Sequence, residues 1–123
     1  MANELVFATF AITFTKANVP SVSFSPKKLE VTVTGTQWSD NVQLIGTVEE
    51  AVLLGDVATG GYWYVENMDA TNFVELRSGT LATDFIRLNA GEWAIFRVSA
   101  DATAPFAIAD TAAVNVRFLK FDS

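Results

Sequence analysis

Hydrophobic and polar residues alternate along most of this chain, with the period of two that is typical of β-strands with one buried face. Between residues 5 and 15 the even-numbered positions are all apolar: Val6, Ala8, Phe10, Ile12 and Phe14. We predict one long strand there, ended by the Ala-Asn-Val-Pro sequence of residues 17–20. Residues 29–34 alternate in the same way and stop at Gly35, which predicts another half-buried strand.

The rest of the chain predicts further short strands. They cover residues 21–25, 42–45, 62–66, 73–77, 85–88, 93–98, 106–109 and 114–121. Asp40 and Asn41 favour a turn, because their side chains bond to nearby backbone groups. In residues 49–54 a short helix competes with a strand, because Glu49 and Glu50 suit the first turn of a helix.

The first predicted hairpin joins residues 62–66 to residues 73–77 through an Asn- and Asp-rich cluster at residues 67–72. In this hairpin Trp63 and Val65 lie on the core side. The reverse side carries Tyr62, Tyr64, Glu66, Phe73, Glu75 and Arg77.

The second predicted hairpin joins residues 85–88 to residues 93–98 through Gly91, which can take the left-handed conformation that bulged turns require. Its register pairs Ile86 with Ala94 and Phe85 with Ile95, so that both faces are largely apolar. We therefore expect this ribbon to lie inside the molecule or under a neighbour.

The pattern predicts about eight to ten strands, with turn signals at the spacing found in β-sandwiches. Helices and strands do not alternate, so a parallel sheet is not expected. At 123 residues the length is that of a single domain. The expected fold is an all-β, antiparallel, jelly-roll-like sandwich over residues 1–123, with at most one short helix.

The composition removes most catalytic chemistry. The chain has no cysteine and no histidine, the residues that supply most nucleophiles, proton shuttles and transition-metal ligands. No G-x-S-x-G or phosphate-binding glycine motif is present. Asn67, Asp69 and Asn72 lack the calcium-loop pattern, and turn formation accounts for them. We predict no enzyme, no cofactor and no metal site, although a carboxylate pair among the 14 acidic residues stays open.

The charge limits the partners. The formal net charge is −6, and the longest basic run is Lys27-Lys28. Nucleic acid and anionic membranes are therefore not expected partners. An acidic residue, Glu4, stands where a secretory signal carries basic residues, and no apolar stretch is long enough to span a bilayer. We expect a soluble protein that is made and used without translocation.

The aromatic residues are the candidate contact residues. Aromatic rings with polar tips suit sugars and protein interfaces alike. A sugar-stacking platform would use Trp38, Tyr62, Tyr64, Phe73 and Trp93. Core packing is the expected role of Trp63 and Trp93. The residues that we predict to contact a partner are Trp38, Tyr62, Tyr64, Phe73 and Arg77. Half of the chain is hydrophobic and its mean hydropathy is +0.29, which favours self-association or docking on a larger assembly.

Three segments carry a resemblance to a known class of proteins. They are GGYWYVENMDATNFVELRSG (residues 60–79), FIRLNAGEWAIFRV (residues 85–98) and TAAVNVRFLKFD (residues 111–122). Their succession of an aromatic strand, an Asn-x-Asp turn, an A-G-E hairpin and a closing strand resembles small β-sandwich virion proteins of tailed bacteriophages.

The resemblance implies a virion structural protein without catalysis. The expected role is capsid decoration: an oligomer, such as a trimer, seated on the capsid surface and bridging subunits of the major capsid protein. Such a protein is made in the host cytoplasm and ends in the virion. A tail, connector or fibre component is the first alternative, and a carbohydrate-binding β-sandwich module is the second.

Overall fold

The computed structural model describes residues 4–33, 35–55, 57, 60–99 and 105–122. These residues form twelve β-strands and no helix, and every strand pairing is antiparallel. The predicted all-β fold is confirmed. The chain divides into two compact units, Met1–Thr34 and Gly35–Ser123, and the sandwich lies in the second.

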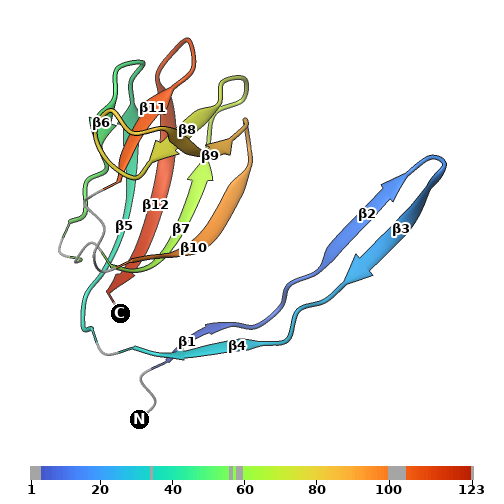
Figure 1. Cartoon of the computed structure of the whole chain (residues 1–123). Coiled ribbons are helices and arrows are strands. Elements are labelled where there is room, and N and C mark those ends of the chain that lie inside the picture. The colour runs from blue at the N-terminus through green and yellow to red at the C-terminus, as the bar shows by residue number, and fades with distance from the viewer. Residues whose placement is uncertain (1–3, 34, 56, 58–59, 100–104, 123) are drawn as a thin grey trace. The chain divides into compact units, whose positions relative to one another are not determined.

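Two four-stranded sheets pack face to face in the second unit (Figure 1). The first sheet has the order β10-β7-β12-β5, and the second has the order β6-β11-β8-β9. The first sheet consists of β5 (Trp38–Ile45), β7 (Gly61–Asn67), β10 (Trp93–Val98) and β12 (Val114–Asp122). The second consists of β6 (Glu50–Ala51), β8 (Val74–Arg77), β9 (Asp84–Leu88) and β11 (Phe106–Ala109).

The strand pairs are nested. β5 pairs with β12, β6 with β11, β7 with β10, and β8 with β9. The chain from β5 to β12 is thus arranged as one long hairpin with its tip between β8 and β9. Ladders between β7 and β12 and between β8 and β11 complete the two sheets. As a result, among the sandwich strands that the structure describes, only β8 and β9 are neighbours both in the sequence and in a sheet.

The core fills the space between the sheets with alternate residues of each strand. Trp63 lies at its centre, with ring centroids 6.2 Å from Phe118 and 6.3 Å from Phe96. The predicted core positions of Trp63 and Val65 are confirmed, since both are fully buried. The other buried apolar residues of this cluster are Ile45, Val52, Val74, Leu76, Leu88, Val98, Ala107, Ala109, Val114, Val116 and Phe118.

Both predicted hairpins are wrong as pairings. β7 pairs with β10 and β12, not with β8, and β10 pairs with β7, not with β9. Residues 67–72 do turn the chain, but they carry it from one sheet to the other. The cause is the nesting, which places consecutive strands other than β8 and β9 in opposite sheets.

Three local predictions also need correction. The predicted turn at Asp40 and Asn41 is wrong, because β5 runs through both residues. Residues 49–54 hold the short strand β6, where a helix competed with a strand. The predicted strand over residues 5–15 is broken between Phe7 and Ile12. This break and β6 raise the number of strands in the described residues to twelve, where about eight to ten were predicted.

The first unit is a two-stranded antiparallel ribbon. β1 (Glu4–Phe7) pairs with β4 (Leu29–Thr32), and β2 (Ile12–Lys16) pairs with β3 (Val19–Phe24). Asn18, in the left-handed region at φ 63°, closes the β2–β3 hairpin. No described residue of this unit is buried, and its strands belong to neither sheet of the sandwich. That residues 1–123 form a single domain therefore stays a prediction.

Candidate functional site: the outer aromatic face

The candidate site is the side of the β10-β7-β12-β5 sheet that points away from the core. Because Trp63 and Val65 point inward, Tyr62, Tyr64 and Glu66 of β7 point outward. Residues directly opposite one another on paired strands share a face. The register therefore places two aromatic residues of neighbouring strands, Phe121 and Trp38, in line with Tyr62. We call this surface the outer aromatic face; its members are Trp38, Asp40, Val42, Leu44, Tyr62, Tyr64, Glu66, Trp93, Ile95, Arg97, Arg117, Leu119 and Phe121.

Its aromatic side chains contact neighbours across the strands. The rings of Tyr64 and Trp93 lie 5.8 Å apart at 32°. The guanidinium of Arg97 lies 4.4 Å from the centre of the Tyr62 ring, within the range of a cation–π contact. Such contacts orient the rings against the neighbouring strands.

The phenol of Tyr64 is held in its protonated form. Its hydroxyl donates a hydrogen bond of 2.5 Å to Oε1 of Glu66. Burial, followed by the hydrogen bond and the charge of Glu66, raises the pKa of Tyr64 to about 12. At neutral pH Tyr64 is therefore a hydrogen-bond donor, and it does not supply a base.

An ion pair crosses the same face between β12 and β5. Nε and Nη2 of Arg117 donate to Oδ1 and Oδ2 of Asp40 at 2.9 and 2.8 Å. This forked hydrogen bond holds the pKa of Asp40 below its usual value. Asp40 thus acts in the strand pairing, which explains why it does not form the predicted turn.

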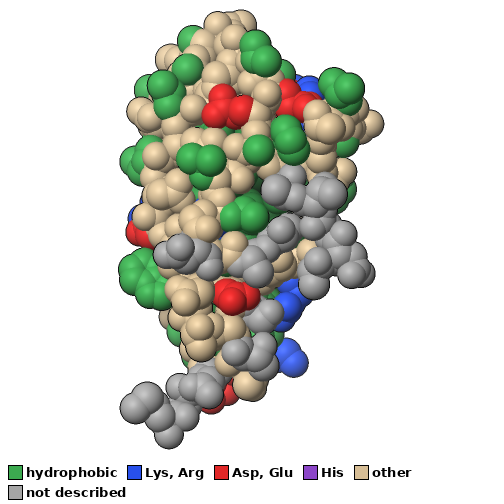
Figure 2. Space-filling view, turned by 90° about the vertical axis from the view of Figure 1, so that its left-hand side faces the viewer, with side chains coloured by type: hydrophobic (Ala, Val, Ile, Leu, Met, Phe, Trp, Pro, Cys, Tyr) green, Lys and Arg blue, Asp and Glu red, His purple; other side chains and the backbone are tan. Residues whose placement is uncertain are grey.

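Large apolar side chains remain exposed on this face. Trp38 is 65% exposed, Val42 53%, Leu44 60% and Trp93 48%. The predicted core role of Trp93 is wrong, because its partner across β7 is Glu66, on the outer side. On the side of the molecule drawn in Figure 2, separate hydrophobic side chains stand among polar ones. Exposed apolar area of this kind is typical of surfaces that contact other proteins.

The five predicted contact residues divide between the two sheets. Trp38, Tyr62 and Tyr64 lie together on the outer aromatic face. Arg77 belongs to β8, and Phe73 directly precedes it, so neither is on that face. The guanidinium of Arg87 lies 3.9 Å from the centre of the Phe73 ring.

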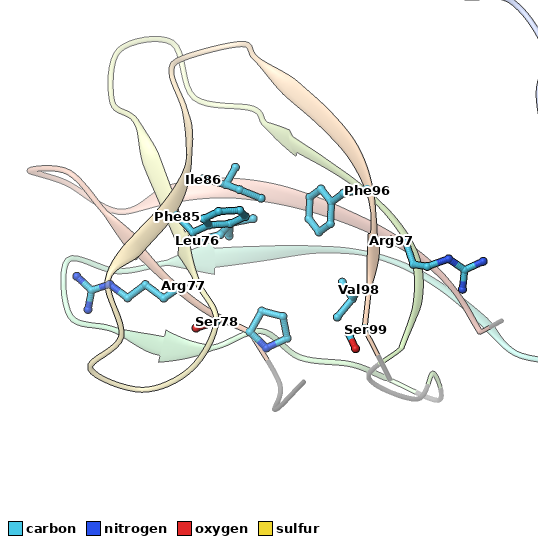
Figure 3. Close-up of a pocket in the computed structure, with 10 residues that line it drawn as sticks. Leu76, Arg77, Ser78, Phe85, Ile86, Phe96, Arg97, Val98 and Ser99 are labelled. Atoms are coloured by element: carbon cyan, nitrogen blue, oxygen red, sulfur yellow. The ribbon is translucent and has the colours of Figure 1, made fainter. Parts of the chain in front are cut away.

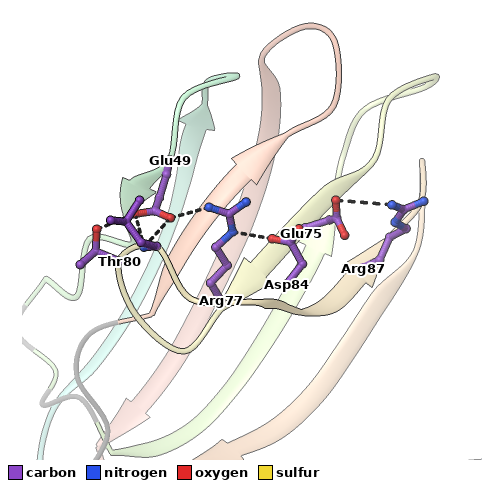
Figure 4. A network of polar contacts seen from close by, with 7 residues as sticks. Glu49, Glu75, Arg77, Thr80, Asp84 and Arg87 are labelled. Atoms are coloured by element: carbon purple, nitrogen blue, oxygen red, sulfur yellow. Dashed lines mark hydrogen bonds and ion pairs between the residues drawn. The ribbon is translucent and has the colours of Figure 1, made fainter.

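Arg77 has a structural role in a polar network (Figure 4). It donates to the carboxylates of Asp84 and Glu49, the second through Nη1 at 2.5 Å. Glu49 also accepts from the Thr80 hydroxyl at 2.7 Å and from the Leu81 amide at 2.9 Å. These donors, Thr80 first, lower the pKa of Glu49. The network connects Glu49 to residues 77–84 at the tip of the long β5–β12 hairpin, and the guanidinium of Arg77 pairs with carboxylates of the same chain.

A small pocket opens where β10 faces β8 and β9 (Figure 3). Its volume is about 210 Å³, and its apolar lining includes Leu76, Phe85, Ile86, Phe96, Val98 and Pro105. Among the described residues that line it, none is a carboxylate. Neither predicted hairpin indicated this pocket, because strands of different sheets form it.

Buried polar residues are the features that sequence reasoning missed. Lys120 is fully buried on the inward side of β12, and its ammonium group donates to the Leu53 carbonyl. Burial lowers the pKa of Lys120. Gln43 joins β5 to β6 by donating to the Ala51 carbonyl at 3.0 Å. Both serve the fold rather than the outer surface.

Neither a metal-binding cluster nor a membrane-spanning helix occurs among the described residues. They contain no group of three or more acidic residues that could hold a metal ion. They also contain no helix that could span a membrane. Comparisons of the chain with protein-family models, with curated proteins and with solved structures found no match.

Proposed function

We propose that this chain is a structural protein of a bacteriophage virion, a decoration protein that binds the capsid surface and bridges subunits of the shell. The observation that carries the proposal is the exposed apolar area, spread over the outer aromatic face and the N-terminal ribbon. Surfaces of this kind supply contact area between proteins. The three segments that resemble phage sandwich proteins support the same role.

The topology also supports this role. Eight strands paired first with last, second with seventh, third with sixth and fourth with fifth follow the order of a jelly roll, in which one long hairpin wraps into two sheets. We propose that the second unit is a jelly roll. This architecture recurs in viral capsid domains and also in lectins, so it favours a binding or assembly role without separating the two.

The proposed mechanism needs no reacting group. Each bound copy adds interfacial area between neighbouring shell subunits. The shell then withstands more internal pressure from packaged DNA, because opening it must also expose the apolar area that the decoration protein covers.

The test is binding of the full chain to three targets. These are expanded empty shells of the major capsid protein encoded in the same genome, tails of the same phage, and a glycan array. We expect saturable co-sedimentation with shells and a higher temperature of shell opening when the protein is bound. Binding to tails alone would instead indicate a tail component. Glycan binding that disappears in Trp38→Ala, without shell binding, would indicate a carbohydrate-binding module and overturn the proposal.

A further inference from the structure

The N-terminal ribbon has two chemically different faces in its outer hairpin. Ile12 lies opposite Phe24, and Phe14 opposite Val22, so these four apolar side chains share one face. Thr13 lies opposite Ser23 on the other face. The four apolar side chains are 46–57% exposed. An isolated two-stranded ribbon is marginally stable in water, so this face needs a cover.

The ribbon and the sandwich carry charge of opposite sign. Residues 1–34 hold three lysines and two glutamates, a formal charge of +1. Since the whole chain carries −6, residues 35–123 carry −7. Two ribbons repel each other and two sandwiches repel each other more strongly. Of the three possible pairings between copies, only ribbon against sandwich joins units of unlike net charge. The outer aromatic face itself carries Asp40, Glu66, Arg97 and Arg117, so its own formal charge is balanced.

The contact area also favours an exchange between copies. From Glu4 to Lys16, at about 3.3 Å per residue for extended chain, β1, β2 and the residues that join them reach at most roughly 40 Å, and two strands make the ribbon roughly 10 Å wide. One ribbon laid on a second copy would bury roughly 800 Å² in total, which is too little for a stable dimer. Two ribbons exchanged reciprocally would bury roughly 1,600 Å², the size of a standard stable interface.

We propose that the ribbon is an exchange arm, whose apolar face lies on the outer aromatic face of a second copy of this chain. That face offers exposed apolar side chains of matching kind, above all Trp38, Val42 and Leu44. The proposal rests on the proposed function in one respect. An assembly role implies that the outer aromatic face is covered by another protein, and the proposal names a second copy of this chain as that protein.

The first experiment measures association of the isolated full chain by sedimentation equilibrium. Ile12→Asn/Phe24→Asn places two amide side chains on the apolar face, and Thr13→Asn/Ser23→Asn places the same two side chains on the hydroxyl face as a matched control; neither variant changes the charge of the ribbon. We expect the dissociation constant to rise by about a hundredfold or more in the first variant, since each lost apolar side chain is worth more than tenfold. The control stays close to wild type. A wild-type chain that is monomeric at every concentration, or equal weakening by both variants, would overturn the proposal.

The second experiment locates the contact. A photoreactive benzoylphenylalanine replaces Phe14, and the products are separated on a denaturing gel and mapped by mass spectrometry. We expect covalent dimers linked to peptides of β5, β7 or β12. Dimers linked only within residues 4–33, or linkage within one chain only, would overturn the arm exchange. Because no shell is present, either failure leaves the shell-binding result untouched, and failure to bind shells leaves this result untouched.

Discussion

Asn67 is expected to be the polar residue on which the crossover between the two sheets most depends. It ends β7 and is fully buried. Its side-chain amide donates to the carbonyls of Asn72 at 2.8 Å and Leu88 at 3.0 Å. Its side-chain oxygen accepts from the Asp69 amide at 2.9 Å. One side chain thus shapes the turn and ties the first sheet to the end of β9 in the second.

The perturbation is Asn67→Ala. It removes three hydrogen bonds and leaves the Leu88 carbonyl without its side-chain donor inside the protein. A buried group that loses its partner costs about 1–3 kcal/mol, and an ordinary lost hydrogen bond about 1 kcal/mol. We therefore expect the free energy of unfolding to fall by about 3 kcal/mol. For a domain of this size that loss lowers the Tm by roughly 12 °C or more.

The assay is urea unfolding followed by tryptophan fluorescence, which reports on the buried ring of Trp63. The control is Asn115→Ala on β12, where the side chain is exposed and a change within about 0.5 kcal/mol is expected. Asn67→Asp keeps the side-chain acceptor and loses both donated hydrogen bonds. Its free energy of unfolding should therefore lie between those of wild type and Asn67→Ala, or below both. If Asn67→Ala matched the Asn115→Ala control, the side chain would not be holding the crossover, and this reasoning would be refuted.

Three further substitutions test other features. Because burial lowers the pKa of Lys120, the unfolded chain holds this proton more tightly than the folded one. Stability should therefore rise as the pH climbs from the folded-state pKa toward the usual value of 10.5. Lys120→Met should abolish that rise in urea titrations across the alkaline range, whereas a persistent rise would assign it to another group. Gly91→Ala meets no atom within 4 Å but has φ +79°, so calorimetry should show a loss of only about 1 kcal/mol. Gly35→Ala should cost more, because the added methyl would lie 2.5 Å from Cγ and 2.6 Å from the carbonyl oxygen of Asp122; equal losses would contradict this steric argument.

The period of two predicted the strands and faces of the sandwich well where one face is polar. β7 and β12 lie where the alternation predicts them, and Trp63 and Val65 are buried as expected. Alternation predicts which residues of one strand share a face, but it does not predict which other strand pairs with that strand. The predicted hairpins therefore pair each strand with its nearest neighbour in the sequence. In a nested arrangement that choice fails for every sandwich pair except β8 and β9.

This pairing error explains why only some of the predicted contact residues lie together on one face. Tyr62 and Tyr64 lie on the outer aromatic face because side chains alternate between the two sides of β7, and this alternation can be seen in the sequence. Phe73 and Arg77 belong to the predicted contact set only through the false hairpin; Arg77 lies in β8 of the other sheet, and Phe73 directly precedes that strand. Trp93 failed for a different reason: both sides of β10 are apolar, so parity could not choose its buried side.

Contacts between distant residues were beyond the pattern altogether. Asp40 and Asn41 are turn-formers by themselves, yet Arg117, 77 residues away, keeps Asp40 in a strand. The alternation along β12 places Lys120 on the inward side. The sequence gives no sign, however, that the Leu53 carbonyl is available inside the core to accept a hydrogen bond from its ammonium group. The energy that overrides the local preference comes in each case from a partner that only the fold supplies.

In the ribbon, apolar and polar residues alternate along β2 and β3 as predicted, but the apolar side chains are not buried. In the sandwich, alternating residues are matched by alternating burial, as in β7, where Gly61, Trp63 and Val65 are buried and the residues between them are not. In β2 and β3 the same alternation leaves every residue exposed. An apolar face of four side chains gives a lone chain no stability, and it favours aggregation. The physical use of such a face is against another surface, and the unlike charge and the area both favour the sandwich of a second copy.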